Sequence, residues 1–412
     1  MIPVTTFAGR RVAVFGLGAS GNATALALVA GGAEVAAWDD RERSRDAATK
    51  AGVPVVDLGA ADWSRFDALV LAPGVPLTHP EPHWTVKRAR AAGVEVIGDI
   101  ELFFRERAVL APRSPVVAIT GTNGKSTTTA LTAHILRTAG CDVQMGGNIG
   151  RAVLTLEPPH MDRIHVVEMS SFQIDLTSDA FATPTIAALL NLSPDHLDRH
   201  GTMAEYAAVK ERLVAGAEVA VIGMEDGAQH PEELCSDIRA RLKRRGGAVL
   251  AFTRKPALHP GMIWCEGGAL LRRTEGDGGP EKLAETAGIA TLRGAHNGEN
   301  AAAAFVICER LGVDAATIAR AMKTYPGLPH RMEEVGRRGR VLYINDSKAT
   351  NADSTEKALA SWPGDIFWIV GGKPKEGGIT ILADYFPRIT HAYLIGQSSD
   401  DFAATLEGKV PW

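Results

Sequence analysis

Residues 116–127 read Val-Val-Ala-Ile-Thr-Gly-Thr-Asn-Gly-Lys-Ser-Thr, and this stretch decides how the chain folds. Its first five residues are apolar or β-branched, which predicts a buried strand over Val116–Thr120. A turn with two glycines follows, and an alanine- and threonine-rich run then predicts a helix over residues 126–139. Where a strand, a glycine turn and a helix follow in this order, the backbone N–H groups at the helix start can bind phosphate.

The turn carries the residues that a nucleoside triphosphate needs. Lys125 can neutralise the β- and γ-phosphates, and the Ser126 hydroxyl can ligate Mg²⁺. A strict P-loop has a glycine five positions before Gly124, where this chain has Ile119, so the full pattern is not met. A chance Gly-Lys-Ser at a helix start is the alternative, but the strand and helix around the turn favour a site for ATP and Mg²⁺. Its expected members are Gly121, Thr122, Asn123, Gly124, Lys125, Ser126 and Thr127.

A second phosphate motif, Gly16-Leu-Gly-Ala-Ser-Gly21, lies near the N-terminus. It follows the predicted strand Arg11–Phe15 and opens the predicted helix Ala19–Ala30, and Asp39 stands at the end of the next predicted strand. The glycines permit a tight turn, the helix start can bind a pyrophosphate, and the acidic residue can read a ribose hydroxyl. On these residues alone a nicotinamide or flavin enzyme is the first interpretation. A turn that only packs the helix on the sheet is the alternative.

Two phosphate motifs on two strand–helix units are difficult to reconcile with a dehydrogenase. They fit an ATP-driven reaction on a substrate that carries its own pyrophosphate. Short β-branched runs alternate with alanine-rich stretches along the chain, which is typical of an α/β protein with a parallel sheet covered by helices. We expect three units at residues 1–107, 108–326 and 327–412, with a charged linker over 105–115 and a Pro/Gly hinge over 325–330.

The composition excludes several classes of protein. The chain has 412 residues, of which 45% are hydrophobic and 22% charged, as in a folded protein with a sizeable core. Lysine and arginine number 44 and aspartate and glutamate 48, and this net charge of −4 gives no case for nucleic acid or an acidic membrane as partner. No apolar run approaches the ~20 residues of a membrane span. The four cysteines form no CxxC pair, so neither a disulfide framework nor a thiolate zinc site is indicated, and a reducing cytoplasm is the expected location. We expect the protein to be a monomer.

Further polar residues lie where the predicted central strands end. Glu168 closes the strand predicted over residues 165–168, a place where a carboxylate can serve an ATP-binding loop. The segment Asp-His-Leu-Asp-Arg-His at residues 195–200 allows three interpretations: a metal cluster, a substrate or phosphate contact through His196, or a capped polar turn. Lys210 lies in a predicted helix, and its spacing alone indicates an ordinary surface lysine.

Polar loops also follow the predicted strands of the third unit. Ligands of an open α/β sheet bind at the carboxyl ends of its strands, which makes the loops with Lys348 and Lys375 candidates, together with Arg331 just after the hinge. Asn297 and Asn300 lie one turn apart at the start of an alanine-rich helix, where their amides can contact a base or a backbone. Taken singly, each of these segments fits a structural turn equally well.

Six segments, in this order, resemble the Mur ligases of peptidoglycan synthesis, and most closely those members that add D-glutamate. The segments are Thr-Gly-Thr-Asn-Gly-Lys-Ser-Thr at residues 120–127, Glu-Met-Ser-Ser-Phe-Gln at 168–173, Asp-His-Leu-Asp-Arg at 195–199, His-Asn and Asn300 within 296–300, Gly-Leu-Pro-His-Arg at 327–331 and Asn-Asp-Ser-Lys-Ala-Thr-Asn at 345–351. The resemblance implies a Rossmann-like N-terminal domain, a central P-loop ATPase-like domain and a Rossmann-like C-terminal domain. It implies a ligase that uses ATP to add D-glutamate to UDP-N-acetylmuramoyl-L-alanine through an acyl phosphate.

The resemblance also assigns roles by position. A UDP-sugar site is implied at Gly16, Gly18, Gly21, Asp39, Gly74, Asn148 and His196. Contacts with ATP or Mg²⁺ are implied at Lys125, Ser126, Glu168, His196, Asn297, Asn300, Arg331 and Asp346, and contacts with D-glutamate at Lys348, Thr350 and Lys375. Catalysis is implied for Lys125, Glu168, His196, Lys210 and Lys348. Lys210 matches a lysine that the family carries as a carbamate, which changes a cation into an anionic ligand for Mg²⁺.

Other interpretations stay open at this point. They are an NAD-linked oxidoreductase, a nucleotide-binding module without catalysis, a folylpolyglutamate synthase and another Mur ligase. The family's Ser-Pro-Ala-Cys-Ala-Ser loop, which helps to hold D-glutamate, does not occur before Trp412. We therefore expect the third unit to be incomplete.

Overall fold

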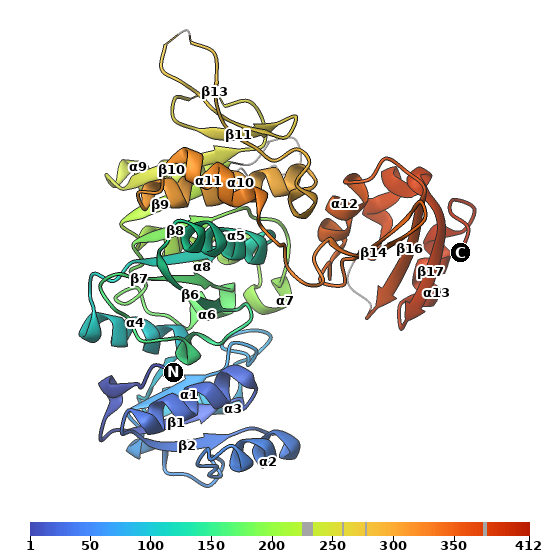
Figure 1. Cartoon of the computed structure of the whole chain (residues 1–412). Helices are drawn as coiled ribbons and strands as arrows, with labels where there is room; N and C mark the ends of the chain where they lie inside the picture. Colours follow the sequence, from blue (N-terminus) through green and yellow to red (C-terminus); the bar gives the residue numbers. More distant parts are fainter. Residues whose placement is uncertain (225–233, 258, 277, 374–376) are drawn as a thin grey trace.

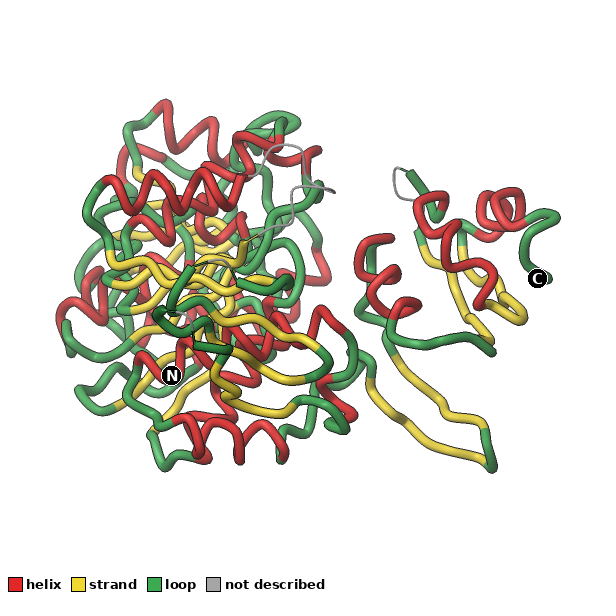
Figure 2. Tube along the Cα trace, turned by 90° about the horizontal axis from the view of Figure 1, so that it is seen from above, coloured by secondary structure: helices red, strands yellow, loops and turns green. Residues whose placement is uncertain are grey.

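A computed structural model describes residues 1–224, 234–257, 259–276, 278–373 and 377–412. Within these residues the strands form four sheets, which lie in three successive parts of the chain (Figure 1). The first two parts stack on one another, and the third stands to one side of them in both views (Figure 2). The predicted α/β class is confirmed.

The first part is a four-stranded parallel sheet in the order β2-β1-β3-β4. Alternate residues of β1 enter two different cores, with Val12 and Val14 on one face and Ala13 and Phe15 on the other. The sheet is therefore buried on both faces, as parallel sheets are. Its elements are η1 (Thr5–Phe7), β1 (Arg11–Phe15), α1 (Ala19–Ala30), β2 (Glu34–Trp38), α2 (Glu42–Lys50), η2 (Trp63–Arg65), β3 (Ala68–Leu71), α3 (Trp84–Ala91) and β4 (Glu95–Ile97).

The second part is a nine-stranded sheet in the order β13-β12-β11-β10-β9-β8-β5-β7-β6. From β6 to β11 in this order, each pair of neighbouring strands is parallel, and β12 and β13 add an antiparallel edge. The strands are β5 (Val116–Thr120), β6 (Asp142–Gly147), β7 (Arg163–Glu168), β8 (Ile186–Leu189), β9 (Val219–Met224), β10 (Ala248–Thr253), β11 (Ile263–Glu266), β12 (Ala269–Arg272) and β13 (Glu281–Glu285).

Helices cover both faces of this second sheet. Val117 and Ile119 of β5 pack in one core with residues of α5, α10 and α11, and Val116 and Ala118 pack in another with residues of α4, α8 and α9. The helices are α4 (Asp99–Leu110), α5 (Lys125–Thr138), η3 (Val153–Thr155), α6 (Ser171–Asp175), α7 (Leu197–His200), α8 (Met203–Ala215), α9 (Leu234–Arg244), η4 (Ala290–Leu292), α10 (Ala295–Arg310) and α11 (Ala315–Lys323).

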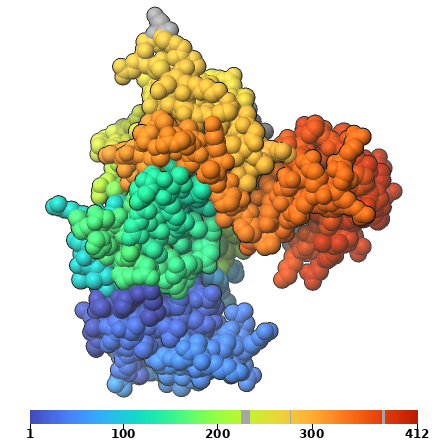
Figure 3. Space-filling view, viewed as in Figure 1, coloured from blue at the N-terminus to red at the C-terminus, as the bar shows by residue number. Residues whose placement is uncertain are grey.

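The third part projects from the second (Figure 3). It has an antiparallel hairpin and a separate parallel pair of strands. Its small core is built around Leu382, Phe386 and Leu406. Its elements are β14 (Glu333–Arg338), β15 (Val341–Asn345), α12 (Ala352–Ala360), β16 (Ile366–Gly372), η5 (Thr380–Arg388), β17 (Ile389–Gly396) and α13 (Ser399–Leu406).

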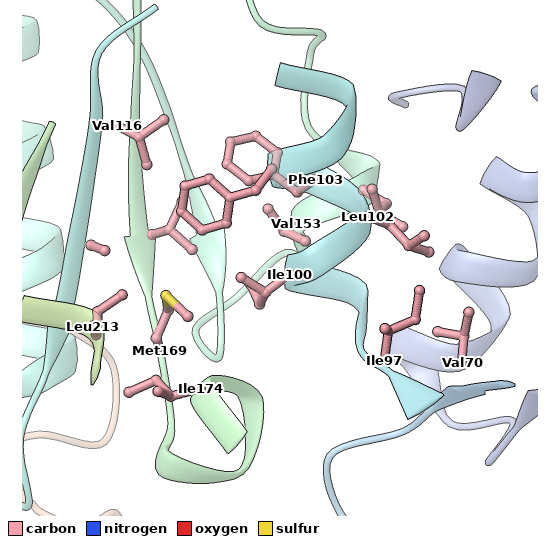
Figure 4. Packing of buried hydrophobic residues seen from close by; sticks show 14 of the residues in the cluster. Val70, Ile97, Ile100, Leu102, Phe103, Val116, Val153, Met169, Ile174 and Leu213 are labelled. Carbon is pink, nitrogen blue, oxygen red and sulfur yellow. The ribbon is translucent and has the colours of Figure 1, made fainter. Parts of the chain in front are cut away.

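Helix α4 joins the cores of the first two parts. Leu102 faces Val70 of the first sheet, and Phe103 on the other side of the helix faces Val116 of the second (Figure 4). The linker expected over residues 105–115 is therefore wrong in its first half, because α4 continues to Leu110. The apolar residues of α4 have partners on both sides, and this packing favours helix over the loop that its charged residues had suggested.

Most predicted elements agree with the structure to within a few residues. The helix predicted over residues 126–139 is α5, Lys125–Thr138, and the strand predicted over residues 165–168 is β7, Arg163–Glu168. Both follow from local patterns that the tertiary structure does not override. In the described part of the chain, no helix combines the length and the apolar character that crossing a membrane requires.

Candidate active site

The carboxyl ends of three neighbouring strands converge on the phosphate loop, which we define as residues 121–124. β5 lies between β7 and β8, and all three strands are parallel. The phosphate loop after β5, Glu168 at the end of β7 and residues 191–196 after β8 consequently lie at one edge of the sheet. This is the edge at which open α/β sheets bind their ligands.

The shape of the phosphate loop is fixed by its neighbours. Gly124 has φ of 82°, and a Cβ at this position would lie 2.2 Å from the Asn300 side-chain oxygen, so that only glycine fits. Asn191 Oδ1 accepts the Asn123 N–H at 2.9 Å, and its Nδ2 donates to the Asn123 carbonyl at 3.1 Å. The loop therefore depends on side chains that are distant in the sequence.

The Lys125 ammonium folds back over the phosphate loop. Its Nζ donates to the carbonyls of Gly121 at 2.9 Å and Thr122 at 2.6 Å. Burial lowers the pKa of Lys125, while the negative charges of Glu168 and Asp195 act to raise it. Lys125 and the two carboxylates thus lie within electrostatic range of one another.

The two carboxylate oxygens of Glu168 differ in their hydrogen bonding. Its Oε1 accepts a hydrogen bond from Asn148 Nδ2 at 2.8 Å, whereas Oε2 is buried without a hydrogen-bond partner among the described residues. The structure thus places Asn148 and Glu168 in direct contact. A buried carboxylate oxygen without a partner is costly unless a ligand completes it, and it fits a hard cation such as Mg²⁺.

The described residues contain no cluster of three or more His, Cys, Asp or Glu side chains placed to hold a metal ion. The interpretation of residues 195–200 as a metal cluster is therefore not supported. A Mg²⁺ bound with a nucleotide does not need such a cluster, because one or two protein oxygens plus phosphate oxygens and waters complete its octahedron. Glu168 and the Ser126 hydroxyl would be sufficient protein ligands.

Lys210 is buried, with 1% of its surface exposed, so the interpretation of it as an ordinary surface lysine is wrong. Helix α8 packs on the sheet with the face that carries Lys210. The Lys210 Nζ donates to Thr120 Oγ1 at 3.1 Å and to the Gly121 carbonyl at 3.0 Å. Burial lowers the pKa of Lys210 well below the usual lysine value, and the charge of Lys125 lowers it further. The amine therefore loses its proton far more readily than a surface lysine does.

His196 occupies a tight left-handed turn, with φ of 56°, at the start of α7. Its ring lies 5.0 Å from the Phe172 ring, and its Nε2 is 3.4 Å from Asp195 Oδ2. The neighbouring His200 is buried, forms a hydrogen bond with Ser171 Oγ at 2.8 Å and stacks against the Phe172 ring. Residues 195–200 are thus held as an ordered turn at the edge of the site.

A cleft of about 610 Å³, open in part to solvent, lies between the second and third parts. Seven residues expected to bind nucleotide line it, namely Asn123, Gly124, Thr127, Asn297, Asn300, Arg331 and Asp346. The two amides are connected, because Asn300 Nδ2 donates to Asn297 Oδ1 at 3.1 Å. The cleft is also lined by Tyr325, Ser354 and Lys357, which the motifs did not indicate because they lie outside any phosphate-binding pattern.

The third part brings one further cation to the phosphate loop. Arg331 Nη2 donates to Ser126 Oγ at 2.9 Å. Asp346 Oδ1 accepts the Met332 N–H at 3.0 Å, and burial raises the pKa of Asp346. Lys348 and Thr350 are exposed on the loop after β15. Lys375 lies outside the described residues.

The N-terminal glycine motif forms the expected turn. A Cβ on Gly21 would lie 1.8 Å from the Gly16 carbonyl oxygen, so this helix start tolerates only glycine. Gly18 is the N-cap of α1, and Asp39 Oδ2 accepts the Leu17 N–H at 2.8 Å. Burial acts to raise the pKa of Asp39, but hydrogen bonds from Arg41 and Leu17 outweigh it and lower the pKa overall.

The first part contacts the second beside the His196 turn. Arg199 donates to the carbonyl of Gly74 at 3.1 Å and to that of Val75 at 2.9 Å. Gly74 and His196, both expected at a UDP-sugar site, are therefore placed on facing loops of two different sheets.

Comparison with known protein families agrees with this arrangement. Residues 119–308 match the Mur ligase middle domain, and residues 10–98 match the N-terminal domain of the MurD-like Mur ligases. This chain belongs to the Mur ligase family. It is a ligase, and the interpretation of the Gly16–Gly21 motif as the site of an oxidoreductase is wrong.

Similar proteins are found among the curated Mur ligases. The UDP-N-acetylmuramoylalanine--D-glutamate ligase of Mesorhizobium japonicum is 55% identical over 412 residues, which is 100% of this chain and 86% of that protein. The enzyme of the same name from Rhizobium meliloti is 56% identical over the same share of both chains. The resemblance to the D-glutamate-adding members is therefore confirmed.

Solved Mur ligase structures share the fold. The UDP-N-acetylmuramate-alanine ligase MurC of Thermotoga maritima matches with a TM-score of 0.62 and 20% identity over 98% of this chain and 90% of that one. The MurF ligase of Thermotoga maritima, solved in complex with ADP, matches with a TM-score of 0.59 and 17% identity over 100% of this chain and 88% of that one. At such identities the match establishes the fold alone.

Proposed function

We propose that this chain is the ligase that uses ATP to join D-glutamate to UDP-N-acetylmuramoyl-L-alanine. The observation that carries the proposal is the convergence of Lys125, Glu168 and Lys210 at one sheet edge. The similarity to ligases with this named substrate, over the full length of the chain, supports it.

ATP would lie in the cleft between the second and third parts. Its phosphates would bind the phosphate loop, Lys125, Ser126 and Thr127, and its adenosine would lie among Asn297, Asn300, Arg331 and Asp346. The helix start of α5 favours negative charge, and Lys125 supplies a fixed cation beside it. Phosphoryl transfer depends chiefly on such positioning and charge stabilisation.

Mg²⁺ would be held by Glu168 and Ser126, and when bound it would neutralise charge on the phosphate oxygens. We also propose that Lys210 carries a carbamate. Its neutral amine would attack CO₂, a C–N bond would form and one proton would leave to solvent. The product is an anion at the position of a buried amine, with Lys125 close enough to balance its charge.

The two remaining substrates would approach from opposite sides. The UDP-sugar would lie along Gly16, Gly18, Gly21 and Asp39, and reach the centre past Gly74, Asn148 and His196. D-glutamate would be held by Lys348, Thr350 and Lys375 of the third part, because cationic side chains bind its carboxylates. The third part would thus complete the centre, as an amino-acid-binding unit.

The chemistry follows from the weakness of a carboxylate as an acyl donor. A carboxylate oxygen of the terminal alanine attacks the γ-phosphorus, the bond to the β-phosphate oxygen breaks, and ADP leaves. The amine of D-glutamate then attacks the acyl phosphate carbon, a C–N bond forms, phosphate leaves and the amine loses a proton. Lys125 stabilises the charge on the transferring phosphoryl group.

Phosphate release with a panel of amino acids tests the proposal. With ATP, Mg²⁺ and UDP-N-acetylmuramoyl-L-alanine present, D-glutamate should stimulate release selectively. Equal release with L-lysine, or release that does not depend on the UDP-sugar, would contradict it. The panel also separates this function from that of a folylpolyglutamate synthase, which would require a folate substrate.

A further inference from the structure

A carboxylate of the third part is in direct contact with the phosphate loop. Asn123 Nδ2 donates to Asp353 Oδ2, and Asn123 Oδ1 accepts a hydrogen bond from Ser354 Oγ at 3.1 Å. Asn123 and Asp353 are 230 positions apart in the sequence. The amide that forms the tip of the phosphate loop is therefore bonded on both sides by the first turn of α12.

The position of Asp353 is fixed by its own helix. Asn351 caps α12, and its Oδ1 accepts the Ser354 N–H at 2.7 Å. A carboxylate in the first turn of a helix is stabilised by the helix dipole. Lys357, one turn later, donates from Nζ to Asp353 Oδ2 at 2.8 Å. The carboxylate is consequently held in place beside Asn123.

A negative charge on Asp353 would repel the nucleotide phosphates that the phosphate loop is proposed to bind. Nucleotide phosphates and the Asp353 carboxylate would both lie beside Asn123, where like charges repel one another. Lys357 lines the cleft itself and acts in the opposite direction. The Asp353 side chain is 35% exposed and that of Lys357 23%, so solvent moderates both effects without removing them.

We propose that Asp353 and Lys357 set the affinity and the charge selectivity of the nucleotide site. Asp353 weakens the binding of every phosphate-bearing nucleotide, most of all those with the highest charge, and Lys357 strengthens it. The carboxylate would thereby keep the product ADP from binding too tightly to the phosphate loop. This inference rests on the proposed function of the cleft as the ATP site.

The test measures binding of ADP, AMP and adenosine by calorimetry at low ionic strength, with EDTA and, separately, with Mg²⁺. The Asp353→Asn variant keeps the shape of the side chain and an oxygen that can accept from Asn123. We expect it to bind ADP about 3- to 10-fold more tightly, AMP less so, and adenosine as the wild type does. Lys357→Gln should shift ADP affinity in the opposite direction, and high salt should reduce both effects.

The matched control is Glu356→Gln, which removes one negative charge from the same helix. The Glu356 carboxylate accepts from Tyr385 Oη at 3.1 Å, and so belongs to the side of α12 that packs on η5. Its ADP affinity should be unchanged.

Four results would overturn the inference. If Asp353→Asn changes the affinity for adenosine as much as that for ADP, the residue acts through structure and not through charge. If it weakens ADP binding with Mg²⁺ but not with EDTA, the carboxylate is a metal ligand. If the wild-type chain binds ADP and Asp353→Asn binds it equally well, only this inference fails, whereas a wild-type chain that binds no nucleotide overturns the proposed function as well.

Discussion

The Arg331 guanidinium donates a hydrogen bond to Ser126 Oγ at 2.9 Å, across 205 positions of sequence. Ser126 lies in the first turn of α5 in the second part, and Arg331 lies just before β14 of the third. The contact places a side chain of the third part against the start of the helix that follows the phosphate loop. The third part would therefore contribute to the proposed nucleotide site as well as to the proposed amino-acid site.

Replacing Arg331 with Gln should raise the KM for ATP by about 10-fold or more, because a charged hydrogen bond beside the phosphates is worth about 1.5–3 kcal/mol. The dissociation constant of the UDP-sugar, measured by calorimetry, should not change. Arg337 on the exposed strand β14 serves as the control, since its replacement with Gln should leave KM unchanged. An equal effect of both variants would mean that general charge, and not the contact with Ser126, is responsible.

Replacing Lys125 with Ala should abolish phosphate release, with a loss of about 1000-fold or more, because the γ-phosphate loses its fixed cation. A phosphate-release assay at saturating ATP measures the loss. The control is Lys87→Ala, which removes an exposed lysine paired with Glu81 on the first part and should leave phosphate release unchanged. Retained turnover of the Lys125 variant would place ATP elsewhere in the molecule.

Lys210 should give a carbamate signal in ¹³C NMR when the protein is equilibrated with ¹³C-bicarbonate. Burial lowers the pKa of this amine, and only the neutral amine attacks CO₂. The signal should therefore rise with pH through the lowered pKa, below the range in which surface lysines react. It should be missing in Lys210→Arg. A signal of equal size in that variant would assign the carbamate to another residue.

The free energy of unfolding should fall as the pH is lowered from about 6.5 towards about 4. Burial lowers the pKa of His200 and of His296, and together with the smaller effects of neighbouring charges, Lys210 for His200 and Lys357 for His296, it brings each pKa to about 4. Below about pH 6.5 the unfolded chain binds a proton at each histidine and the folded chain does not, so each can contribute a slope of up to about 1.4 kcal/mol per pH unit. Below about pH 4 both states are protonated and this contribution to the slope ends.

Urea denaturation across this pH window measures the effect. His200→Gln and His296→Gln should each flatten the dependence. His160, whose side chain is 68% exposed, is the control, and its replacement with Gln should leave the slope unchanged. Identical slopes in the wild type and in both buried-site variants would contradict the assignment.

Replacing Phe103 with Ala should lower the free energy of unfolding by about 3–5 kcal/mol, because it leaves a cavity in the core around α4. The side chain is fully buried between the helix and the second sheet (Figure 4). Val109, on the same helix and 64% exposed, should cost less than about 0.5 kcal/mol when replaced with Ala. If the Phe103 variant unfolds in two separate transitions, α4 also holds the first two parts together.

Much of the fold follows from local patterns. The strand Val116–Thr120, the glycine turn after it and the helix α5 could be predicted because each is encoded within a few residues. The same holds for β1, the Gly16–Gly21 turn and α1. Helix α4 was missed in part, because its charged residues suggest a linker and only packing against two sheets shows it to be a helix.

The candidate site, like the fold, has some features that could be predicted from the sequence and others that could not. The sequence by itself determined the two phosphate motifs, because a strand, a glycine turn and a helix start specify the direction of backbone N–H groups wherever they occur. Only the tertiary structure decided that Lys210 is buried beside Gly121, that Glu168 has an oxygen without a partner among the described residues, and that Asp353 contacts Asn123. These properties depend on strand order and on the docking of the third part, and they bring together residues that no local pattern connects.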